Sequence, residues 1–489
     1  MGILNIFKSS DLPKPDASVA DKATIHQLEL ILRDWLESPI RKEQLLADKY
    51  YQGDHDILRR EKKVIGADGE LVTIHNVANN KLVDNQYRKL VDQKTNYVLG
   101  KPITIATEDE DYLQSLYRVF NKKMHRKLRV LAQYAVDGGI SWLYPYYNEQ
   151  REFKVAVYPS HEVCPIWKDG EHTELESGIR YYTEVVLGDN GKRDVIHRVE
   201  WITPNGVHNF KYQSGSLILD KDNPFTDHIV QDGQGYGWDR LPLIPFKYNH
   251  HEIPLIRNTK CLQDALNQVL SDFQNNMEEN PRTSILVLKN YDGTNIEEFR
   301  HNLATYGVIK VTTVDGVQGG VETLNVEVNA ANYQAILMQL KRALTENGRG
   351  FDAKEERMDG DPNQMNIESM YTDIDLDVNC METEFQAGFE ELKWFIDQHL
   401  KNTEKVDHAD KEVEFVFNRD IFINEDSKIN SCVQSVGILS NRTILSRHPW
   451  VTNVDREEQL LEEDKAKELE EMEIMNAFNQ PTNGGNGGE

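Results

Sequence analysis

The chain has 489 residues, and its 81 acidic and 55 basic residues give a formal net charge of -26 at pH 7. This length predicts two to four substructures rather than one small core. So negative a surface repels nucleic acid, which argues against a protein that grips duplex DNA through phosphate contacts. It is compatible with a surface past which DNA slides.

The cysteines and the start of the chain exclude two further classes of protein. Cys164, Cys261, Cys380 and Cys432 lie far apart with no C-x-x-C pair, so neither a zinc module nor a disulfide framework is indicated, and reduced, buried thiols are expected. The apolar opening is too short for a membrane span or a secretory signal, and Ile6 breaks a myristoylation pattern. We therefore expect a chain that works in solution or in an assembly.

The first hundred residues are predicted to be mainly helical. After a flexible polar leader, 1–24, the apolar spacing predicts a helix over Ile25–Leu36 and a second helix that ends near Gly53. Gly66 and Gly69 then indicate a small hairpin.

A longer amphipathic helix is predicted from Asn76 to Gly100, because apolar residues recur there mostly at three- and four-residue steps until Gly100 and Pro102 end the pattern. Two further helical patterns cover Tyr112–Phe120 and Lys127–Val136. This half of the chain is thus expected to be helical up to the point where the character of the sequence changes.

The middle of the chain is predicted to form an antiparallel sheet, because short β-rich runs alternate with Asn-Gly turn signals. The runs are Ser141–Tyr147, Phe153–Tyr158, Tyr181–Val186, Val195–Ile202 and Leu217–Leu219. The Gly-rich stretch Asp232–Trp238 is predicted to be a loop.

Two striped helices bracket a small insert after Pro245. The first carries Leu262, Ala265, Leu266, Val269, Leu270, Phe273 and Met277, and the second carries Tyr333, Ile336, Leu337, Leu340 and Leu344. Between them the sequence predicts an α/β insert with strands at Ile285–Leu288, Val308–Val314 and Val321–Val328 and a helical turn at Ile296–Leu303.

A polar loop over 349–364 separates this region from a helix of unusual length. Such a long loop inside a compact domain is usually functional or disordered. Asp361 and Pro362 predict the start of a helix that runs to about Leu400 and would span roughly 55–60 Å at ~1.5 Å per residue.

The end of the chain is predicted to be a short strand followed by helices. The strand is Val413–Phe417, and the helical patterns are Ser427–Leu439, Thr443–Arg447 and the acidic segment Asp455–Glu473. Residues from Asn479 onward are rich in Asn and Gly and are expected to be disordered.

Candidate nucleotide sites do not fit their patterns. Leu99-Gly100-Lys101 resembles the end of a P-loop, but Thr95 replaces the first glycine and Pro102 replaces the residue that binds Mg²⁺. Gly233-x-Gly235-x-Gly237 lacks the flanking strand and helix of a dinucleotide fingerprint.

Candidate metal and catalytic residues are also weak. Asp373, Asp375, Asp377 and Glu384 match positions 1, 3, 5 and 12 of an EF-hand, but Val378 stands where the turn needs glycine, and residues two apart on a helix point to different faces. Solvated carboxylates on a long helix are the expected reading. Asp54-His55-Asp56, which we call the His55 cluster, and His250-His251 are not accompanied by the further residues that a metal-binding motif requires. We expect no catalytic residue, no metal and no cofactor.

Two stretches and the order of the parts carry a resemblance to a known family. The pattern Tyr50-Tyr51-x-Gly53-x-His55-x-Ile57 and the sequence NNKLVDNQYRKLVDQKTNYVLGKPI (79–103) resemble the N-terminal signature of the portal proteins of tailed bacteriophages, in the siphovirus branch. The segment VGILSNRTILSRHPWVTNVDREEQLLEED (436–464) is similar to the C-terminal signature. The resemblance covers nearly the whole chain.

This resemblance implies an α+β portal fold with a wing, stem, clip and crown. The wing would comprise 25–250 together with the long helix and strand at 365–420, the stem helices would be 251–280 and 329–348, the clip 281–328, the tunnel loop 349–364 and the crown 421–475, before a disordered tail at 476–489. The tunnel loop would face DNA with mixed charges. Those residues are Arg349, Asp352, Lys354, Glu355, Glu356, Arg357, Asp359 and Asp361.

The family also implies partners and a place in the virion. The chain would form a ring, twelve-fold in the virion, at one capsid vertex, and double-stranded DNA would pass through it without sequence specificity. Partners would be the terminase large subunit, the major capsid and scaffolding proteins and a head-completion adaptor, with assembly in the host cytoplasm. Two alternatives stay open: a metal-dependent nuclease or an ATPase of the packaging machinery, and a non-DNA structural protein of the virion.

Overall fold

The chain divides into two compact units, one formed by 1–352 with 373–420 and the other by 353–372 with 421–489. The structure is a computed structural model that describes residues 22–65, 69–73, 77–187, 191, 193–231, 234–279, 285–289, 320–324, 330–352, 364–419, 425–451 and 454–478. Helices and strands are both abundant in it, so the predicted α+β class is confirmed.

The N-terminal helices confirm the sequence prediction. Helix α1 (Lys22–Glu37) is followed by α2 (Pro39–Gln52), and the Ser38 side chain caps α2 by accepting a hydrogen bond from the Arg41 amide at 3.2 Å. A 3-10 turn, η3 (Asp56–Arg59), leads to the predicted hairpin. Its strands are β1 (Lys63–Ile65) and β2 (Leu71–Thr73), which pair antiparallel.

Two antiparallel sheets form the middle of the first unit. The larger has the order β10-β9-β8-β7-β6 with β11 beside β9, and the smaller has the order β14-β4-β5. The strands are β4 (Ile140–Tyr147), β5 (Phe153–Tyr158), β6 (Val163–Trp167), β7 (Leu175–Leu187), β8 (Arg193–Ile202), β9 (Gly206–Gln213), β10 (Ser216–Leu219), β11 (Phe225–Asp227) and β14 (Ile244–Lys247). The predicted antiparallel region is therefore confirmed.

The loop predicted over Asp232–Trp238 is partly wrong. Strand β13 (Gln234–Tyr236) pairs antiparallel with β12 (Ile229–Gln231), because consecutive runs joined by a short turn can satisfy each other's backbone groups even without a buried face.

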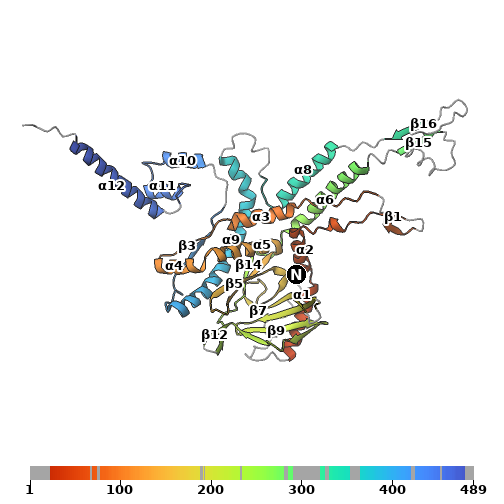
Figure 1. Cartoon of the computed structure of the whole chain (residues 1–489), viewed down its shortest axis with the longest axis horizontal. Helices are drawn as coiled ribbons and strands as arrows, with labels where there is room; N and C mark the ends of the chain where they lie inside the picture. Colours follow the sequence, from red (N-terminus) through yellow and green to blue (C-terminus); the bar gives the residue numbers. More distant parts are fainter. Residues whose placement is uncertain are drawn as a thin grey trace, which may run out of the picture. The chain divides into compact units, whose positions relative to one another are not determined.

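Helix α1 covers one face of the larger sheet, as Figure 1 shows at the lower end of the molecule. Its apolar stripe, Leu28, Ile31, Leu32 and Trp35, packs against Cys164, Ile166, Ile179, Val199, Trp201, Phe210 and Leu217 of the strands. A second cluster, which includes Trp142 of β4 and Trp167 of β6, joins the two sheets. These two clusters bury most of the apolar residues that alternate along the strands.

Three further helices belong to this unit: α3 (Gln86–Leu99), α4 (Glu110–Val119) and α5 (Lys122–Gly138). The helix predicted from Asn76 to Gly100 is wrong in its first half, because α3 begins only at Gln86, with Asn85 as its N-cap. Residues 77–85 form neither a helix nor a strand. We call this segment the strap.

The long helix is confirmed as α9 (Gln364–Glu404), which has 41 residues and therefore spans about 60 Å. Phe385 and Phe389 are fully buried and meet Phe246 of β14 edge to face, with ring centroids 5.1 and 5.4 Å away. After α9, the predicted strand is found as β17 (Glu414–Val416), which pairs with β3 (Thr104–Ala106). The predicted cap residues Asp361 and Pro362 lie outside the described residues.

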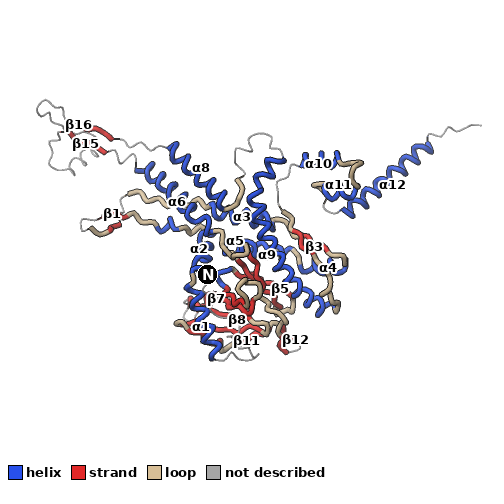
Figure 2. Tube along the Cα trace, turned by 180° about the vertical axis from the view of Figure 1, so that it is seen from behind, coloured by secondary structure: helices blue, strands red, loops and turns tan. Residues whose placement is uncertain are grey.

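Two antiparallel helices leave the first unit together, side by side in both views of the backbone (Figures 1 and 2). They are α6 (Ile256–Glu279) and α8 (Ala330–Asn347), as the sequence predicted. Strands β15 (Ile285–Lys289) and β16 (Gly320–Leu324) pair antiparallel between them along the chain. The predicted helical turn at Ile296–Leu303 and strand at Val308–Val314 lie outside the described residues.

The second unit contains α10 (Glu425–Gln434), α11 (Asn441–Arg447) and α12 (Val454–Phe478). Helix α10 is shorter than the predicted Ser427–Leu439, since turns follow it, and α12 extends beyond the predicted acidic segment. None of the described helices combines the length and the apolar character needed to cross a membrane.

The cysteines differ in part from expectation. All four are free, but only Cys164 and Cys432 are buried, whereas Cys261 and Cys380 are exposed. Both exposed thiols lie on amphipathic helices, on faces that the surrounding subunit does not cover.

Candidate functional site

The candidate site is the helix pair α6–α8 together with the root of the loop that follows α8. Phe273 of α6 and Tyr333 of α8 pack with ring centroids 5.0 Å apart, and Asn276 of α6 donates a hydrogen bond to the Tyr333 hydroxyl at 2.8 Å. Among the described side chains of α8, only Leu344 is fully buried. The pair is thus held to the unit mainly through α6 and through the end of α8.

The buried face of α6 is polar, which the apolar stripe did not predict. Its side chains at strict four-residue spacing, each at most 1% exposed, are Thr259, Gln263, Asn267, Ser271 and Asn275. Most of the predicted stripe is only half-buried, and Met277 is 50% exposed. This polar face of α6 is therefore occupied within the subunit.

The partner of this polar face is the strap, which runs antiparallel to α6. Four of these five side chains, all except Thr259, accept hydrogen bonds from backbone amides. We call these four side chains the ladder. The bonds run from Asn80 to Asn275 at 2.6 Å, from Leu82 to Ser271 at 2.9 Å, from Asp84 to Asn267 at 3.0 Å and from Tyr87 to Gln263 at 2.9 Å. Within the described part of the chain, the Asn275 Nδ2 is the one ladder atom without a hydrogen-bond partner.

The ladder explains why residues 77–85 are not helical. In an extended chain every second amide points the same way, and two extended residues advance about 6.7 Å, close to the roughly 6.0 Å that separates helical residues four apart. Alternate strap amides therefore meet successive ladder side chains. If residues 77–85 were helical, their amides would bond within that helix. The buried polar side chains of the ladder would then lose their partners, at a cost of about 1–3 kcal/mol for each.

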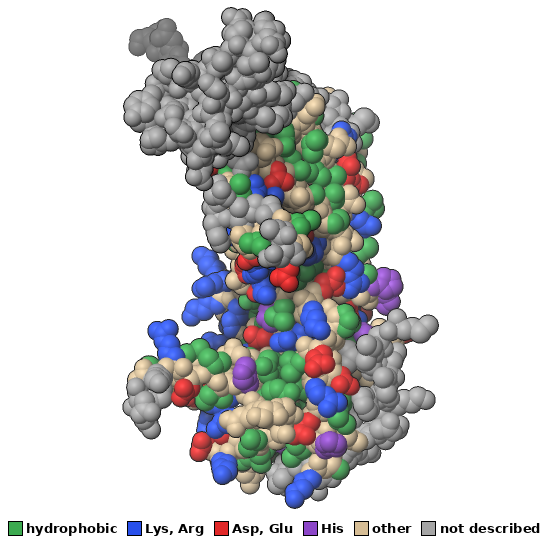
Figure 3. Space-filling view, turned by 90° about the vertical axis from the view of Figure 1, so that its right-hand side faces the viewer, with side chains coloured by type: hydrophobic (Ala, Val, Ile, Leu, Met, Phe, Trp, Pro, Cys, Tyr) green, Lys and Arg blue, Asp and Glu red, His purple; other side chains and the backbone are tan. Residues whose placement is uncertain are grey.

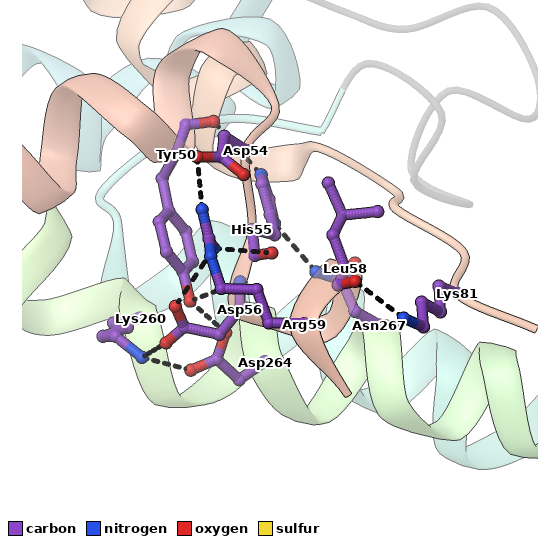
Figure 4. A network of polar contacts seen from close by, with 10 residues as sticks. All are labelled: Tyr50, Asp54, His55, Asp56, Leu58, Arg59, Lys81, Lys260, Asp264 and Asn267. Carbon is purple, nitrogen blue, oxygen red and sulfur yellow. Dashed lines mark hydrogen bonds and ion pairs between the residues drawn. The ribbon is translucent and has the colours of Figure 1, made fainter. Parts of the chain in front are cut away.

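His55 joins the ladder at Asn267, and Figure 4 shows the polar contacts around it. Its ring stacks on Tyr50 at 4.4 Å, with Nε2 3.1 Å from the Tyr50 carbonyl oxygen and Nδ1 2.8 Å from the Asn267 amide nitrogen. Because the Asn267 oxygen already accepts from the strap, its amide group donates to Nδ1, and Nε2 donates to Tyr50. Burial lowers the pKa of His55, which favours this neutral form.

The carboxylates around His55 bond to Tyr50 and Lys260 and do not converge on one point. Asp264 accepts hydrogen bonds from the Tyr50 hydroxyl at 2.5 Å and from Lys260 at 2.6 Å, and Lys260 also pairs with Asp56 at 2.7 Å. Burial raises the pKa of Tyr50 well above its usual range, with the Asp264 hydrogen bond as a further cause. Both ring nitrogens of His55 are occupied by protein groups, so this cluster fits a structural role.

The root of the loop turns sharply between two glycines. Arg349 has φ +47°, and a Cβ at Gly348 or Gly350 would lie 2.6 or 2.3 Å from the Leu90 side chain of α3. Only glycine lets the backbone lie this close to Leu90 on either side of the turn. The amide of Gln93, also on α3, donates to the Phe351 carbonyl at 2.8 Å.

Lys94 fixes the loop root to α9. Its side chain is 0% exposed, and its ammonium group donates to the Arg349 carbonyl at 3.1 Å and to Asp377 at 2.5 Å. The Tyr248 hydroxyl donates to the same Asp377 oxygen, Oδ2. Burial is the largest cause of the lowered pKa of Lys94, which the Asp377 carboxylate opposes, and burial raises the pKa of Tyr248 well above its usual range.

Two of the predicted tunnel-loop residues are described, and both are at the root. The Arg349 guanidinium lies 3.4 Å from Asp377, and Asp352 lies 3.8 Å from Lys89. The other predicted residues lie outside the described residues: Lys354, Glu355, Glu356, Arg357, Asp359 and Asp361.

The EF-hand-like carboxylates lie on a continuous helix and do not converge. Asp375 accepts hydrogen bonds from Tyr97 at 2.6 Å and from Arg419 at 2.7 Å, whereas Asp377 accepts from Lys94 and Tyr248. The reading of these two as simply solvated is therefore wrong, because each is bound by its own partners. No group of three or more potential metal ligands lies together among the described residues.

Comparison with known proteins identifies relatives over most of the chain. The model of the family described as "Phage portal protein, SPP1 Gp6-like" matches residues 39–472. The chain is 28% identical over 424 residues to the portal protein of Bacillus phage SPP1, which covers 85% of this chain and 82% of that protein. It is 27% identical over 453 residues to the portal protein of Clostridium phage phiCD119, covering 90% of this chain and 96% of that protein.

A solved structure also resembles the chain at low similarity. It is a chain in a structure titled "Neck of native GTA particle computed with C12 symmetry", with a TM-score of 0.39 and 12% identity, covering 74% of this chain and 89% of that chain.

Proposed function

Because this chain belongs to the family of phage portal proteins, we propose that it acts as one subunit of a ring through which double-stranded DNA enters and leaves the capsid. The ring would stand at one capsid vertex of the virion, with twelve copies, and DNA of any sequence would pass through its axis.

The observation that carries this proposal is the pair of apolar flanks on α8. Tyr333, Leu337 and Leu344 share the side of α8 that packs toward α6 and the rest of the subunit. Ile336 and Met338 lie on either side of Leu337 and are 48% and 62% exposed. Successive residues on a helix are about 100° apart, so these two side chains leave in opposite directions.

A subunit in a ring has one neighbour on each side, and two apolar flanks suit that arrangement. Met277 of α6 is likewise 50% exposed, and hydrophobic side chains reach the surface among charged ones on the face shown in Figure 3. In a ring, neighbouring copies would cover these side chains.

The portal architecture assigns a part to each region. We propose a wing at 25–250 with 365–420, stem helices at 251–280 and 329–348, a clip at 281–328 and a crown at 421–475. The tunnel loop would be 349–364. The contacts of Lys94 and Leu90 with the loop root support a tunnel loop that begins from a fixed base on the wing.

Partners would follow the order of these parts. The clip would dock the terminase large subunit during packaging and later the head-completion adaptor, while the wing and crown would meet the major capsid and scaffolding proteins. The subunit would assemble in the host cytoplasm and would catalyse no reaction. Ion pairs of Asp375 with Arg419 and of Asp377 with Lys94 offset the negative charge that a nuclease needs for its Mg²⁺ ions.

Electron microscopy of the purified full chain tests the proposal. Rings with an axial hole are expected, and a single-copy particle at high protein concentration would overturn the assignment. The variant Ile336→Glu with Met338→Glu should abolish rings because it places charges on both flanks.

The matched control carries the same added charge on the same helix. Gln334→Glu with Gln339→Glu changes two exposed polar residues and should leave rings intact. Equal assembly of the two variants would show that the flanks of α8 are not subunit contacts.

A further inference from the structure

One helix departs from the acidic character of the chain. Five of the eight residues from Lys122 to Arg129 are Lys or Arg, and His125 is a sixth basic group, in a protein of net charge -26. This run opens α5, whose first amides are capped by Asn121. Neither the fold nor the proposed ring explains why cations gather here.

The structure sorts this run into an inner and an outer face. Met124 and Leu128 are buried in the core, whereas Lys122, Arg126 and Arg129 are exposed at positions i, i+4 and i+7. Residues at this spacing lie on one side of a helix. We call these three residues the α5 basic face.

The α5 basic face borders a groove of about 320 Å³ between α5 and α3. The opposite wall is formed by Tyr51, Asp92, Thr95 and Asn96, and Val130 is the only aliphatic residue in the lining. The single carboxylate, Asp92, already accepts a hydrogen bond from Tyr51 at 2.9 Å and lies 3.6 Å from Arg88.

Among the described residues, the cations of this face are not paired with carboxylates. No carboxylate forms an ion pair with Lys122 or Arg126 in the described part of the chain, and Arg129 donates to the neutral Asn96 amide at 2.5 Å. The neighbouring pocket of about 700 Å³ on the other side of α5 differs, because there Arg118 pairs with Glu404 at 3.0 Å and Lys154 with Glu152 at 3.0 Å.

Helix electrostatics disfavour this arrangement. The N-terminal end of a helix carries a partial positive charge that favours acidic residues, yet the first turn of α5 holds Lys122 and Lys123 and no acidic residue. Lysines in the first turn of a helix do not favour its folding. Such an unfavourable arrangement is expected where the function of the protein requires it.

We propose that the α5 basic face binds backbone phosphates of double-stranded DNA, an inference that rests on the proposed function. Asp92 and Asn96 line both this groove and the adjoining pocket of about 550 Å³ that contains Phe351, so the face continues to the root of the tunnel loop. A polar, cationic lining suits nucleic acid, since protein interfaces have apolar cores depleted in charge. Contacts with backbone phosphates do not depend on base sequence, which suits a conduit for DNA of any sequence.

The test is DNA binding by the double variant Lys122→Glu with Arg126→Glu. A labelled blunt-ended DNA duplex is titrated with the full-length protein at several salt concentrations. We expect at least a tenfold loss of affinity and a salt slope that is shallower by about 1 for each phosphate contact removed. Glutamate near the start of α5 is favoured by the helix, so the thermal midpoint should not fall.

The control is Lys42→Glu with Lys221→Glu, which makes the same change in net charge at exposed residues elsewhere. Equal affinity of the two double variants would overturn the proposal, because net charge alone would then account for any loss. The milder variant Lys122→Gln with Arg126→Gln should weaken binding in the same direction.

Assembly is measured on the same samples by electron microscopy. Rings that lose DNA binding only in the α5 variant support the proposal. Loss of rings in that variant alone would show that the face contacts a neighbouring copy instead, which overturns DNA as its partner. Wild-type protein that forms no ring would refute the proposed function, and its DNA affinity would still decide the role of the face.

Discussion

Helices α6 and α8 form one pair but are held in opposite ways. Helix α6 is bonded along more than half its length by the ladder, whose four side chains reach from Gln263 to Asn275. Helix α8 is fixed mainly where it ends, at Leu344 and at the turn that Lys94 and Gln93 hold. Helix α6 is therefore a fixed part of the subunit, whereas α8 is held mainly by packing against α6 and by its anchored end.

The difference teaches how polar and apolar contacts divide the work. Hydrogen bonds depend on angle as well as distance, so the ladder fixes the rotation of α6 about its own axis. Apolar contacts tolerate rotation and repacking. The apolar flanks of α8 can therefore adapt to a neighbour while α6 keeps its orientation.

The largest effect is expected where the end of α8 is anchored. Lys94→Met leaves the Arg349 carbonyl and the Asp377 carboxylate without their buried cation, and breaking a buried pair costs about 3–5 kcal/mol. Denaturant unfolding at one protein concentration measures the loss. Lys89→Met, an exposed residue of the same helix, should cost about 1 kcal/mol or less. Similar midpoints for the two variants would contradict an anchor at Lys94.

Breaking the centre of the ladder should cost somewhat less. Asn267→Leu removes the acceptor for the Asp84 amide and the donor for His55, and we expect a loss of about 2–4 kcal/mol. Hydrogen exchange should then rise along the strap before it rises in α8. Gln268→Leu on the exposed side of α6 should be near neutral. Unchanged exchange at Asp84 in the Asn267 variant would exclude the ladder as the strap's support.

The α6 side should also respond to pH. Tyr87, whose amide forms the last rung, donates its hydroxyl to Asp137 at 2.5 Å, and burial raises the pKa of Asp137 to about 7. A carboxyl whose pKa is raised on folding stabilises the protein below its unfolded pKa and loses that contribution as pH rises through 7. The wild type should lose about 2 kcal/mol between pH 5 and 7 from this group.

Asp137→Asn keeps an acceptor for Tyr87 but cannot ionise, so its stability should vary less over this range. Urea unfolding of both proteins at pH 5, 6 and 7 gives the difference in slope. A parallel pH dependence would mean that Asp137 does not titrate between these values.

The smallest effect is expected at the hydrogen bond between Leu82 and Ser271. Ser271→Ala removes the acceptor for the Leu82 amide in a part-buried hydrogen bond and should cost about 1 kcal/mol. Thr345→Ala on α8 removes a hydroxyl that bonds only to the Lys341 carbonyl within its own helix, so it should cost less. Thermal unfolding can rank the two, and the reverse order would weaken the contrast between the helices.

Elements with their own periodicity could be predicted from the sequence. The α1 stripe, the long α9 and the alternating strands of the larger sheet each carry a local pattern that decides the structure. The stripe of α8 predicted its packing side only in part, since Tyr333 and Leu344 pack inward whereas Ile336 is 48% exposed. The strap could not be predicted in this way, because its amides are satisfied by side chains nearly two hundred residues away.

The loop root was missed for a similar reason. Lys94 has the pattern of an ordinary helix lysine, and its carboxylate partner Asp377 lies 283 residues further along the chain. Two signals were present, however. Polar residues at strict four-residue spacing from Thr259 to Asn275 interrupt the apolar pattern of α6, and Gly348-x-Gly350 after a helix indicates a turn pressed against a neighbour.

The repeat distance along the strap, two residues, differs slightly from the repeat distance along α6, four residues. The two spacings differ by about 0.7 Å per step, so after the two steps from Asn80 to Asp84 the offset is about 1.4 Å, and a third such step would increase it further. The interval between bonded amides accordingly changes from two residues to three between Asp84 and Tyr87, where α3 begins. The difference between the two repeat distances therefore limits how many residues of the strap can bond to the ladder in succession.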